Sequence, residues 1–250
     1  SGTKREFGKA CDANFGNKVY ELDALPAVIE GVVTLHPQHY EKVGICGEDH
    51  RFYGTYFLQD DTGTILVLKD SRIADFTYGD RVRLRVRGVV KQFGTLAVTA
   101  FDQEEIVADA SDESLKVPFE RLDESYKSHF ERDGMEWQLR NCFDLTDGFA
   151  VPQGFANNYR ITGRVCREPN SRNFNELLLQ NRKGKCVDNP KYEWTVSLGL
   201  ELGRRGLEIE RGDVITVTGP VSGRLVGLVP ACEWTFRMLA TTFGQFDGVQ

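Results

Sequence analysis

Residues 81 to 88 alternate strictly between charged and apolar side chains. Arginine occupies every second position, and the residues between the arginines are Val82, Leu84, Val86 and Gly88. Because successive side chains of a β-strand point to opposite faces of a sheet, this pattern predicts a strand with one buried and one exposed face. The exposed face is either a surface for nucleic acid or the solvated outside of a barrel. It carries the arginine ladder, which we define as Arg81, Arg83, Arg85 and Arg87.

Two parts of the chain repeat the same order of β-rich runs and turn signals. In the first part, the apolar run 24–35 precedes a hairpin over 52–70, whose Asp-Asp-Thr-Gly turn separates two β-rich runs. The strand of the arginine ladder and a last strand at 95–101 complete this part. Each part predicts five strands, with a longer connection between the third and the fourth. In the second part the corresponding runs are 159–169, 176–186, 192–202, 214–223 and 224–236.

The order of these strands resembles the OB-fold, a small five-stranded Greek-key barrel. The segments "GTYFLQDDTGTILV" (54–67) and "YGDRVRLRVRGVVKQFG" (78–94) look like strands two to four of bacterial OB-fold domains of nucleic-acid-binding and secreted proteins. The resemblance implies an all-β fold of two OB-like barrels joined by a partly helical connector. The expected boundaries are an N-terminal arm at 1–23, the first barrel at 24–107, an acidic connector at 108–156, the second barrel at 157–243 and a C-terminal tail at 244–250.

Comparison of the two predicted barrels assigns the arginine ladder to the outside. When Gly88 is aligned with Gly219, the apolar residues of both fourth strands coincide and face the core. The arginines then fall opposite uncharged residues, so the fold itself does not require charge at these positions. We expect neighbouring carboxylates to pair with the ladder and keep this face soluble. The candidates are Asp60, Asp61, Asp102, Glu104 and Glu105.

The connector combines acidic and aromatic residues. Ser111 or Ser114 could start a helix, and the apolar positions that follow have roughly helical spacing. Trp137 and Phe143 indicate that the segment packs against a barrel, because large aromatic side chains are usually at least partly buried. A solvated acidic helix is the alternative. The helical stripe consists of Phe119, Leu122, Tyr126 and Phe130.

The distribution of charge along the chain indicates which class of ligand the protein could bind, and where. The 250 residues are 40% hydrophobic, which is typical of a folded globular protein, and no apolar run approaches the roughly 20 residues of a membrane helix. The net charge of −6 argues against a general nucleic-acid binder. However, residues 157–243 contain 13 basic and 9 acidic side chains. A polyanion is therefore expected at the second barrel.

The hairpin between strands two and three of the second barrel concentrates basic and aromatic residues. Basic residues interleaved with aromatic rings suit single-stranded nucleic acid or another polyanion. The alternative is an ordinary solvated hairpin tip. The ligand-binding candidates here are Arg182, Lys183, Lys185, Tyr192 and Trp194.

The first barrel offers a second set of candidates. OB barrels usually bind ligands on the outer face of strands two and three and in the flanking loops. Alternation allows only one set of the strand-two aromatic residues to face outward, and the other set belongs to the core. The outward pair would be Tyr53 and Phe57, with Lys91 and Phe93 in and beside the loop after strand four.

The segment 36–50 reads as a loop that contains three of the four histidines. Nitrogen and sulfur donors suit zinc, but the spacing of these residues matches no zinc module known to us. No hydrolase, kinase or dinucleotide-binding motif occurs in the sequence. We therefore predict no enzyme activity, no cofactor and no metal site. The residues of the metal-like cluster are His36, His39, Cys46 and His50.

Six dispersed cysteines, without a Cys-x-x-Cys pair, favour disulfides and an oxidising compartment. Cys11 could pair with Cys46, and the other four could pair within the connector and the second barrel. The first residues, Ser-Gly, are typical of a cleaved tag, so we expect a periplasmic or secreted protein whose targeting segment has been removed. Free buried thiols in a cytosolic protein are the alternative. The remaining cysteines are Cys142, Cys166, Cys186 and Cys232.

These observations predict a non-catalytic OB-fold binding protein. The expected ligand is single-stranded nucleic acid or another extended polyanion, a hypothesis that the fold resemblance favours. The alternative is an extracytoplasmic scaffold that binds protein or glycan through its barrel faces. The acidic net charge and the cysteines favour this alternative.

Overall fold

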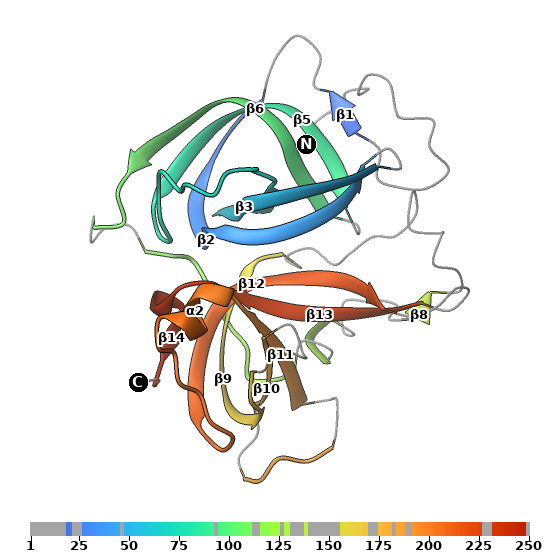
Figure 1. Ribbon diagram of the computed structural model, residues 1–250, viewed down its shortest axis with the longest axis vertical. Coiled ribbons are helices and arrows are strands. Elements are labelled where there is room, and N and C mark those ends of the chain that lie inside the picture. The colour runs from blue at the N-terminus through green and yellow to red at the C-terminus, as the bar shows by residue number, and fades with distance from the viewer. Residues whose placement is uncertain are drawn as a thin grey trace. The chain divides into compact units, whose positions relative to one another are not determined.

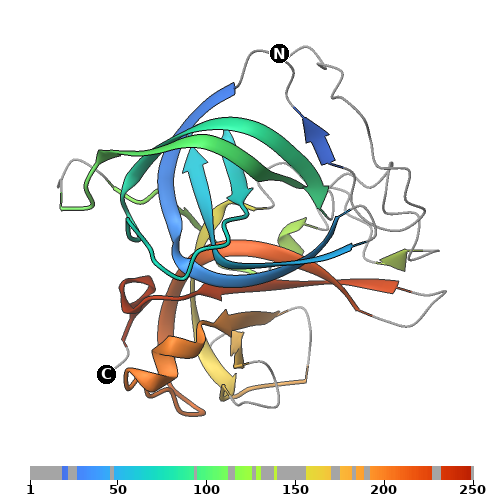
Figure 2. The same cartoon turned by 45° about the horizontal axis from the view of Figure 1, so that its top comes forward.

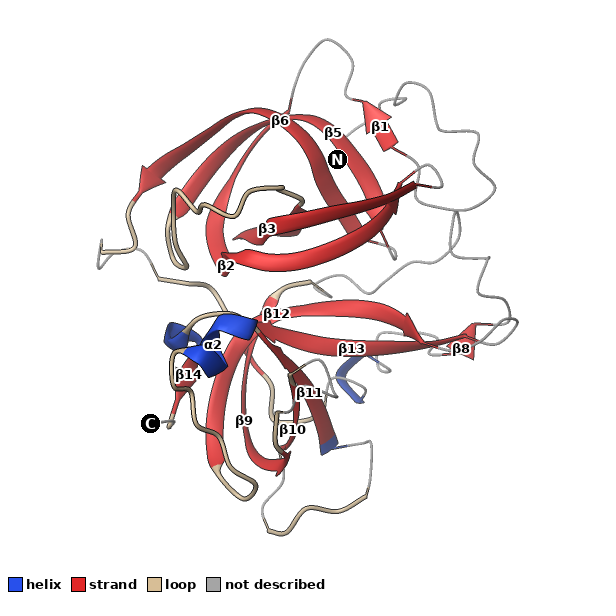
Figure 3. Ribbon diagram, viewed as in Figure 1, coloured by secondary structure: helices blue, strands red, loops and turns tan. Residues whose placement is uncertain are grey.

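The computed structural model describes residues 19–21, 27–45, 48–92, 95–111, 116–125, 128–130, 138–139, 156–169, 175–181, 184–188, 192–226 and 232–248. The chain forms two compact units. The first contains Ser1–Val117 and Leu145–Phe149, and the second contains Pro118–Asp144 and Ala150–Gln250. Strands dominate both units, and the helices are short (Figure 3). No helix in the described part of the chain is both long and apolar enough to span a membrane.

The first unit contains a closed five-stranded barrel, as predicted (Figure 1). Its strands pair in the order β2-β3-β4-β6-β5, and β5 pairs with β2 to close the ring. All pairs are antiparallel except β4 with β6. Figure 2 shows these blue and green strands curving around a common interior. The strands are β2 (Ala27–Ile45), β3 (Glu48–Asp60), β4 (Gly63–Val67), β5 (Arg81–Gln92) and β6 (Thr95–Ala108), and the short β1 (Val19–Glu21) pairs with β5.

The apolar face of β5 forms part of the barrel core. Val82 and Leu84 are fully buried, and Val86 is 2% exposed. They pack with residues of neighbouring strands, including Tyr56 and Leu58 of β3. The alternation read from the sequence is therefore confirmed, and the arginine ladder lies on the outside.

Carboxylates pair with every arginine of the ladder. Glu30 of β2 binds Arg81 at 2.5 Å and Arg83 at 2.8 Å. Asp102 of β6 pairs with Arg85 and Arg87.

Two of the carboxylates expected at the ladder have other roles. Glu104 accepts a hydrogen bond from the buried Tyr56 hydroxyl (2.8 Å) and pairs with Lys69. Asp60 accepts hydrogen bonds from Thr62 in the β3–β4 turn. Of the other candidates, Asp102 and Glu105 do pair with the ladder, Glu105 at 3.7 Å from Arg83.

The segment 36–50, predicted as a loop, is instead the end of a long hairpin. β2 and β3 remain paired up to Ile45 and Glu48. Cross-strand contacts stabilise this arm, since the rings of Tyr40 and Tyr53 lie 5.1 Å apart and Lys42 binds Asp49 at 2.6 Å. The loop prediction was wrong because polar residues on the exposed arm conceal its strand pattern.

The second unit repeats the same strand order. β9-β10-β11-β13-β12 form a ring that closes through β12 and β9, and only β11 with β13 are parallel. The helix α2 (Leu200–Arg204) lies between β11 and β12, and the 3₁₀ helix η4 (Phe243–Gln245) follows β13. The ring strands are β9 (Asn158–Arg167), β10 (Glu176–Gln180), β11 (Glu193–Leu198), β12 (Val214–Val226) and β13 (Cys232–Ala240). The additional strands are β7 (Glu120–Arg121), β8 (Gln138–Leu139) and β14 (Phe246–Asp247).

Glycines at equivalent places allow close backbone approach in both barrels. A Cβ on Gly31 of β2 would lie 2.9 Å from the carbonyl oxygen of Gln59, and one on Gly163 of β9 would lie 3.0 Å from that of Gln180. Both contacts join strand one to strand two of the respective barrel. The recurrent strand-one glycine is therefore a steric requirement of the barrel.

The connector differs from the predicted helix. Residues Glu120 and Arg121 form β7, which pairs in parallel with β9, and helix in the described connector residues is limited to 128–130. Leu122 and Phe130 are buried, and the ring of Phe130 lies 6.0 Å from that of Tyr159. The stripe was therefore wrong for Phe119 and Leu122, because the strand pairing of Glu120 and Arg121, which local spacing does not reveal, orders this part, whereas Phe130 lies in helical residues of a partly helical connector. Ser114, Tyr126, Trp137 and Phe143 lie outside the described residues.

The Glu30 ion pairs predict an acid dependence of stability. Partial desolvation raises the pKa of Glu30, but hydrogen bonds from Arg83 and Arg81 outweigh it, so the pKa lies below its ordinary value of 4.5. A lowered pKa in the folded state stabilises the protein above about pH 4.5, and this stability is lost as the pH falls through the folded-state pKa. Glu30→Gln should therefore destabilise the protein at pH 7, by less than about 1 kcal/mol for such exposed pairs.

Denaturant unfolding at pH 7 and pH 3 measures this effect. The deficit of Glu30→Gln should shrink at pH 3, while Asp61→Asn, which removes an exposed carboxylate from the β3–β4 turn, should show no such change. An equal deficit of Glu30→Gln at both pH values would contradict the assignment.

Candidate functional site

The predicted ligand residues of the second barrel do not form one group. Trp194 is fully buried, and its indole N–H donates a hydrogen bond to the Glu124 carbonyl oxygen (2.9 Å). It cannot offer a ring face to a ligand, because its position on β11 faces the core. Tyr192 is 37% exposed and Lys185 is exposed. Arg182 and Lys183 lie outside the described residues.

The predicted set of the first barrel is also divided. Phe57 is only 3% exposed, so the expectation of an open stacking ring is wrong for this residue. Both faces of β3 are buried around it, which a simple alternation argument does not anticipate. Tyr53 is half-buried, and the Arg72 guanidinium lies 4.8 Å from its ring centre. The side chain of Lys91 and all of Phe93 lie outside the described residues.

The histidine-rich arm does not assemble a metal site within the described residues. His39 pairs with Glu41 at 2.9 Å, and His50 lies 3.9 Å from Glu48. No group of three potential ligands was found in the described part of the chain, and Cys46 falls outside it.

The outer face of β9 presents a basic and hydroxyl-bearing surface instead. Ile161 and Val165 point into the core, so the alternate residues Arg160, Thr162 and Arg164 face outward. On the neighbouring strand β12, Thr216 continues this surface, and its hydroxyl lies 2.7 Å from that of Thr162.

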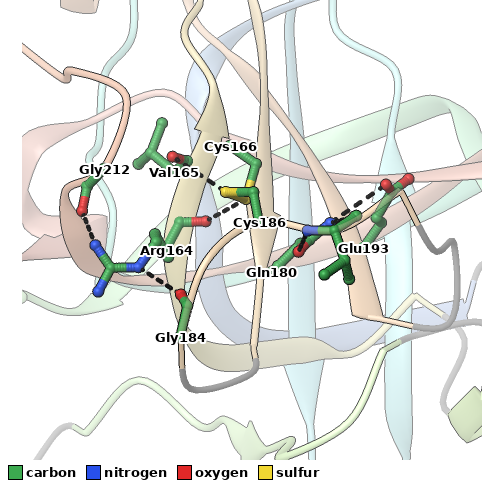
Figure 4. The surroundings of a disulfide bond; sticks show 9 residues. Arg164, Val165, Cys166, Gln180, Gly184, Cys186, Glu193 and Gly212 are labelled. Carbon is green, nitrogen blue, oxygen red and sulfur yellow. Dashed lines mark hydrogen bonds between the residues drawn. A yellow bond between two sulfur atoms is a disulfide. The ribbon is translucent and has the colours of Figure 1, made fainter.

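A disulfide ties the β10–β11 loop to this face (Figure 4). Cys166 on β9 is bonded to Cys186 in the loop, with 5.7 Å between their Cα atoms. The expectation of a disulfide within the second barrel is therefore confirmed for these two cysteines. Cys11, Cys46, Cys142 and the side chain of Cys232 lie outside the described part.

Hydrogen bonds fix the same loop in place. Arg164 donates to the carbonyl oxygen of Gly184 (3.0 Å) and to that of Gly212, as Figure 4 shows. Gln180 accepts a hydrogen bond from the Val187 backbone N–H (2.9 Å) and donates one back to the Val187 carbonyl oxygen. The exposed Lys185 is thus carried by a loop that is anchored on both sides.

The charge on this face is less compensated than the charge on the arginine ladder. Arg160 pairs with Asp247 of β14 and lies 5.1 Å from the Phe119 ring. Neither Arg121 nor Lys185 has a carboxylate within ion-pair distance in the described part of the chain. We define the β9 surface as Arg121, Arg160, Thr162, Arg164 and Lys185.

A shallow cavity opens in the β9 surface. It has room for more than one water molecule. The residues around it are Arg121, Leu122, Asp123, Arg160, Thr162 and Asn181.

Sequence reasoning missed most of this surface. The available signal was the segment 159–165, where outward polar residues alternate with buried ones as they do in the arginine ladder. Arg121 could not have been found in this way, because its place depends on the pairing of β7 with β9.

Comparisons with known proteins do not assign a family. No protein-family model matches the chain, and no curated protein sequence matches it. The solved structure described as "Crystal structure of the tetrameric p202 HIN2" is 13% identical, with a TM-score of 0.36, over 92% of this chain and 95% of that chain. Another, described as "Molecular basis for abrogation of activation of pro-inflammatory cytokines", is 9% identical, with a TM-score of 0.31, over 90% and 93%. Such TM-scores do not establish a shared fold, so the OB-like assignment depends on the strand order described above.

The disulfide predicts a measurable stabilisation of the second barrel. The bond joins residues 20 positions apart, and closure of a loop of this size removes unfolded-state entropy worth about 3 kcal/mol. Cys166→Ser/Cys186→Ser should lower the free energy of unfolding by about this amount, measured by denaturant titration. The wild type treated with a reductant should lose a similar amount, whereas the double variant should be insensitive to the reductant at this bond.

Proposed function

We propose that the chain is a non-catalytic binding protein and that its second barrel binds single-stranded nucleic acid through the β9 surface. The observation that carries the proposal is the contrast between the two basic faces. Every arginine of the ladder has a carboxylate partner. Among the described residues, the cations of the β9 surface have one such partner, Asp247, which pairs with Arg160.

The composition of the β9 surface suits a phosphate backbone. Guanidinium groups form charge-assisted hydrogen bonds with phosphate oxygens, and hydroxyl groups such as that of Thr162 add neutral ones. The anchored loop holds Lys185 beside the same face, so little conformational freedom is lost there on binding. These contacts are made to the sugar-phosphate backbone of the nucleic acid and do not select particular bases.

A second candidate function is favoured by the Cys166–Cys186 disulfide. Such bonds persist mainly in oxidising compartments, so we propose a periplasmic or secreted location. An extracytoplasmic scaffold would bind proteins or glycans in that compartment, and a sulfated glycan would suit the basic β9 surface. This candidate is distinguished from the first by the ligand that the protein prefers.

A salt titration of the full chain tests the proposal. The probe is a fluorescent oligo-dT of about 12 nucleotides, within the usual range of OB-fold site sizes. Arg121→Thr/Lys185→Thr should weaken binding and reduce the slope of log affinity against log salt by about 1.4, since each contact to a single strand contributes about 0.7. The matched control Arg83→Thr/Arg85→Thr removes two cations from the ladder and should leave affinity and slope nearly unchanged.

The outcomes separate the two candidates. If wild-type protein fails to bind the oligonucleotide at low salt but binds heparin, the nucleic-acid proposal is wrong and the glycan candidate is supported. A loss of oligonucleotide binding in the ladder variant, with the β9 variant unaffected, would place the site on the first barrel. Failure to bind either polyanion would overturn the assignment of a polyanion site to the β9 surface.

A further inference from the structure

Two arginines lie side by side in the cavity of the β9 surface. Arg121 of β7 and Arg160 of β9 are register partners in a parallel strand pair, and both line the cavity. Paired strands lie about 4.8 Å apart, and like charges directly opposite each other are destabilising. The arrangement therefore favours an anion held between the two guanidinium groups.

Asp247 does not balance both arginines. Its carboxylate pairs with Arg160 from β14, whereas no carboxylate in the described part of the chain pairs with Arg121. Asp123 also lines the cavity and contributes one negative charge. With Asp247 counted, two arginines and two aspartates leave the cavity and its surroundings formally neutral, and Arg121 is the cation without a carboxylate partner among the described residues.

Two neutral groups of the lining add hydrogen-bonding capacity. The Thr162 hydroxyl can donate to an anion in place of its contact with Thr216. The Asn181 amide is buried, and neither its Nδ2 nor its Oδ1 has a hydrogen-bond partner among the described residues. An unpartnered buried amide is costly, and an oxyanion supplies the acceptor that the Nδ2 group lacks.

We infer that this cavity is a phosphate subsite that holds one backbone phosphate of a bound strand between Arg121 and Arg160. The inference rests on the proposed function for the identity of the strand, but the cavity itself is assigned from its own lining. The cavity has room for more than one water molecule and is open to solvent, so a small anion can enter it. The remaining cations of the β9 surface then contact neighbouring phosphates, so this subsite sets the position of the strand.

Variants of Arg121 in the full chain test the subsite. Arg121→Gln should weaken oligo-dT binding about tenfold and lower the salt slope by about 0.7, because one charged contact is lost. Arg121→Lys should keep the salt slope but lose part of the affinity, because lysine retains the charge without the guanidinium geometry. Arg205→Gln removes an exposed cation in the turn after α2, outside the cavity lining, and should change neither quantity.

Inorganic phosphate provides a second, independent measurement. At constant ionic strength, phosphate should shift the side-chain N–H resonances of Arg160 and Asn181 in a saturable way in the wild type and should not do so in Arg121→Gln. Thermal unfolding confirms that the variants remain folded.

The two proposals fail in different ways. If the oligonucleotide binds, but Arg121→Gln leaves its salt slope unchanged and phosphate causes no saturable shift, the subsite is wrong and the proposed function stands. If phosphate causes the shift but no oligonucleotide binds at low salt, the anion cavity is supported and the nucleic-acid function is wrong. Shifts that remain equal in wild type and Arg121→Gln would also overturn the subsite.

Discussion

Closure of each barrel between its first and fourth strands is the constraint on which the structure depends. Once β2 pairs with β5, and β9 with β12, every side chain of these strands must face either the sealed interior or the outside. Gly31 and Gly163 permit the tight approach to the next strand, and Val82 and Leu84 fill one interior. Most of the charge therefore lies on the outer faces, where binding chemistry can vary without change to the core.

The two barrels use their outer faces differently. In the first, Glu30 and Asp102 neutralise the cations of β5 and make the face a soluble exterior. In the second, Arg164 donates its hydrogen bonds to backbone carbonyl oxygens. These bonds order the neighbouring turns, and because a carbonyl oxygen is neutral, they do not cancel the positive charge of the guanidinium group. The same strand order thus supports a neutralised face in one unit and a basic face in the other.

Local sequence patterns predicted the parts of the fold that depend on alternation. The inward face of β5, the outward arginine ladder and the five-strand order of both units are confirmed. Phe57 was misjudged because both faces of β3 are buried around it, which alternation does not encode. Trp194 was misjudged although it alternates with Val196 and Leu198 on the core face of β11. Arg121 required a pairing between β7 and β9 that joins residues distant in sequence. Site predictions at Arg182, Lys183 and Phe93 remain predictions, since these residues lie outside the described part.

The closing pairs also have a consequence for the order of folding. Ala27 pairs with Val86, and Val214 pairs with Arg164, so neither ring can close until its fourth strand has been synthesised. Such non-local pairing is slow, because the chain loses the entropy of a long loop before the stabilising contacts between the strands can form. During synthesis, β2 and β3 can pair early through their short connection, but the free edge of β2 stays open to other strands until β5 arrives. A chain with two rings of the same strand order therefore depends on completing the first ring before the edges of the second emerge.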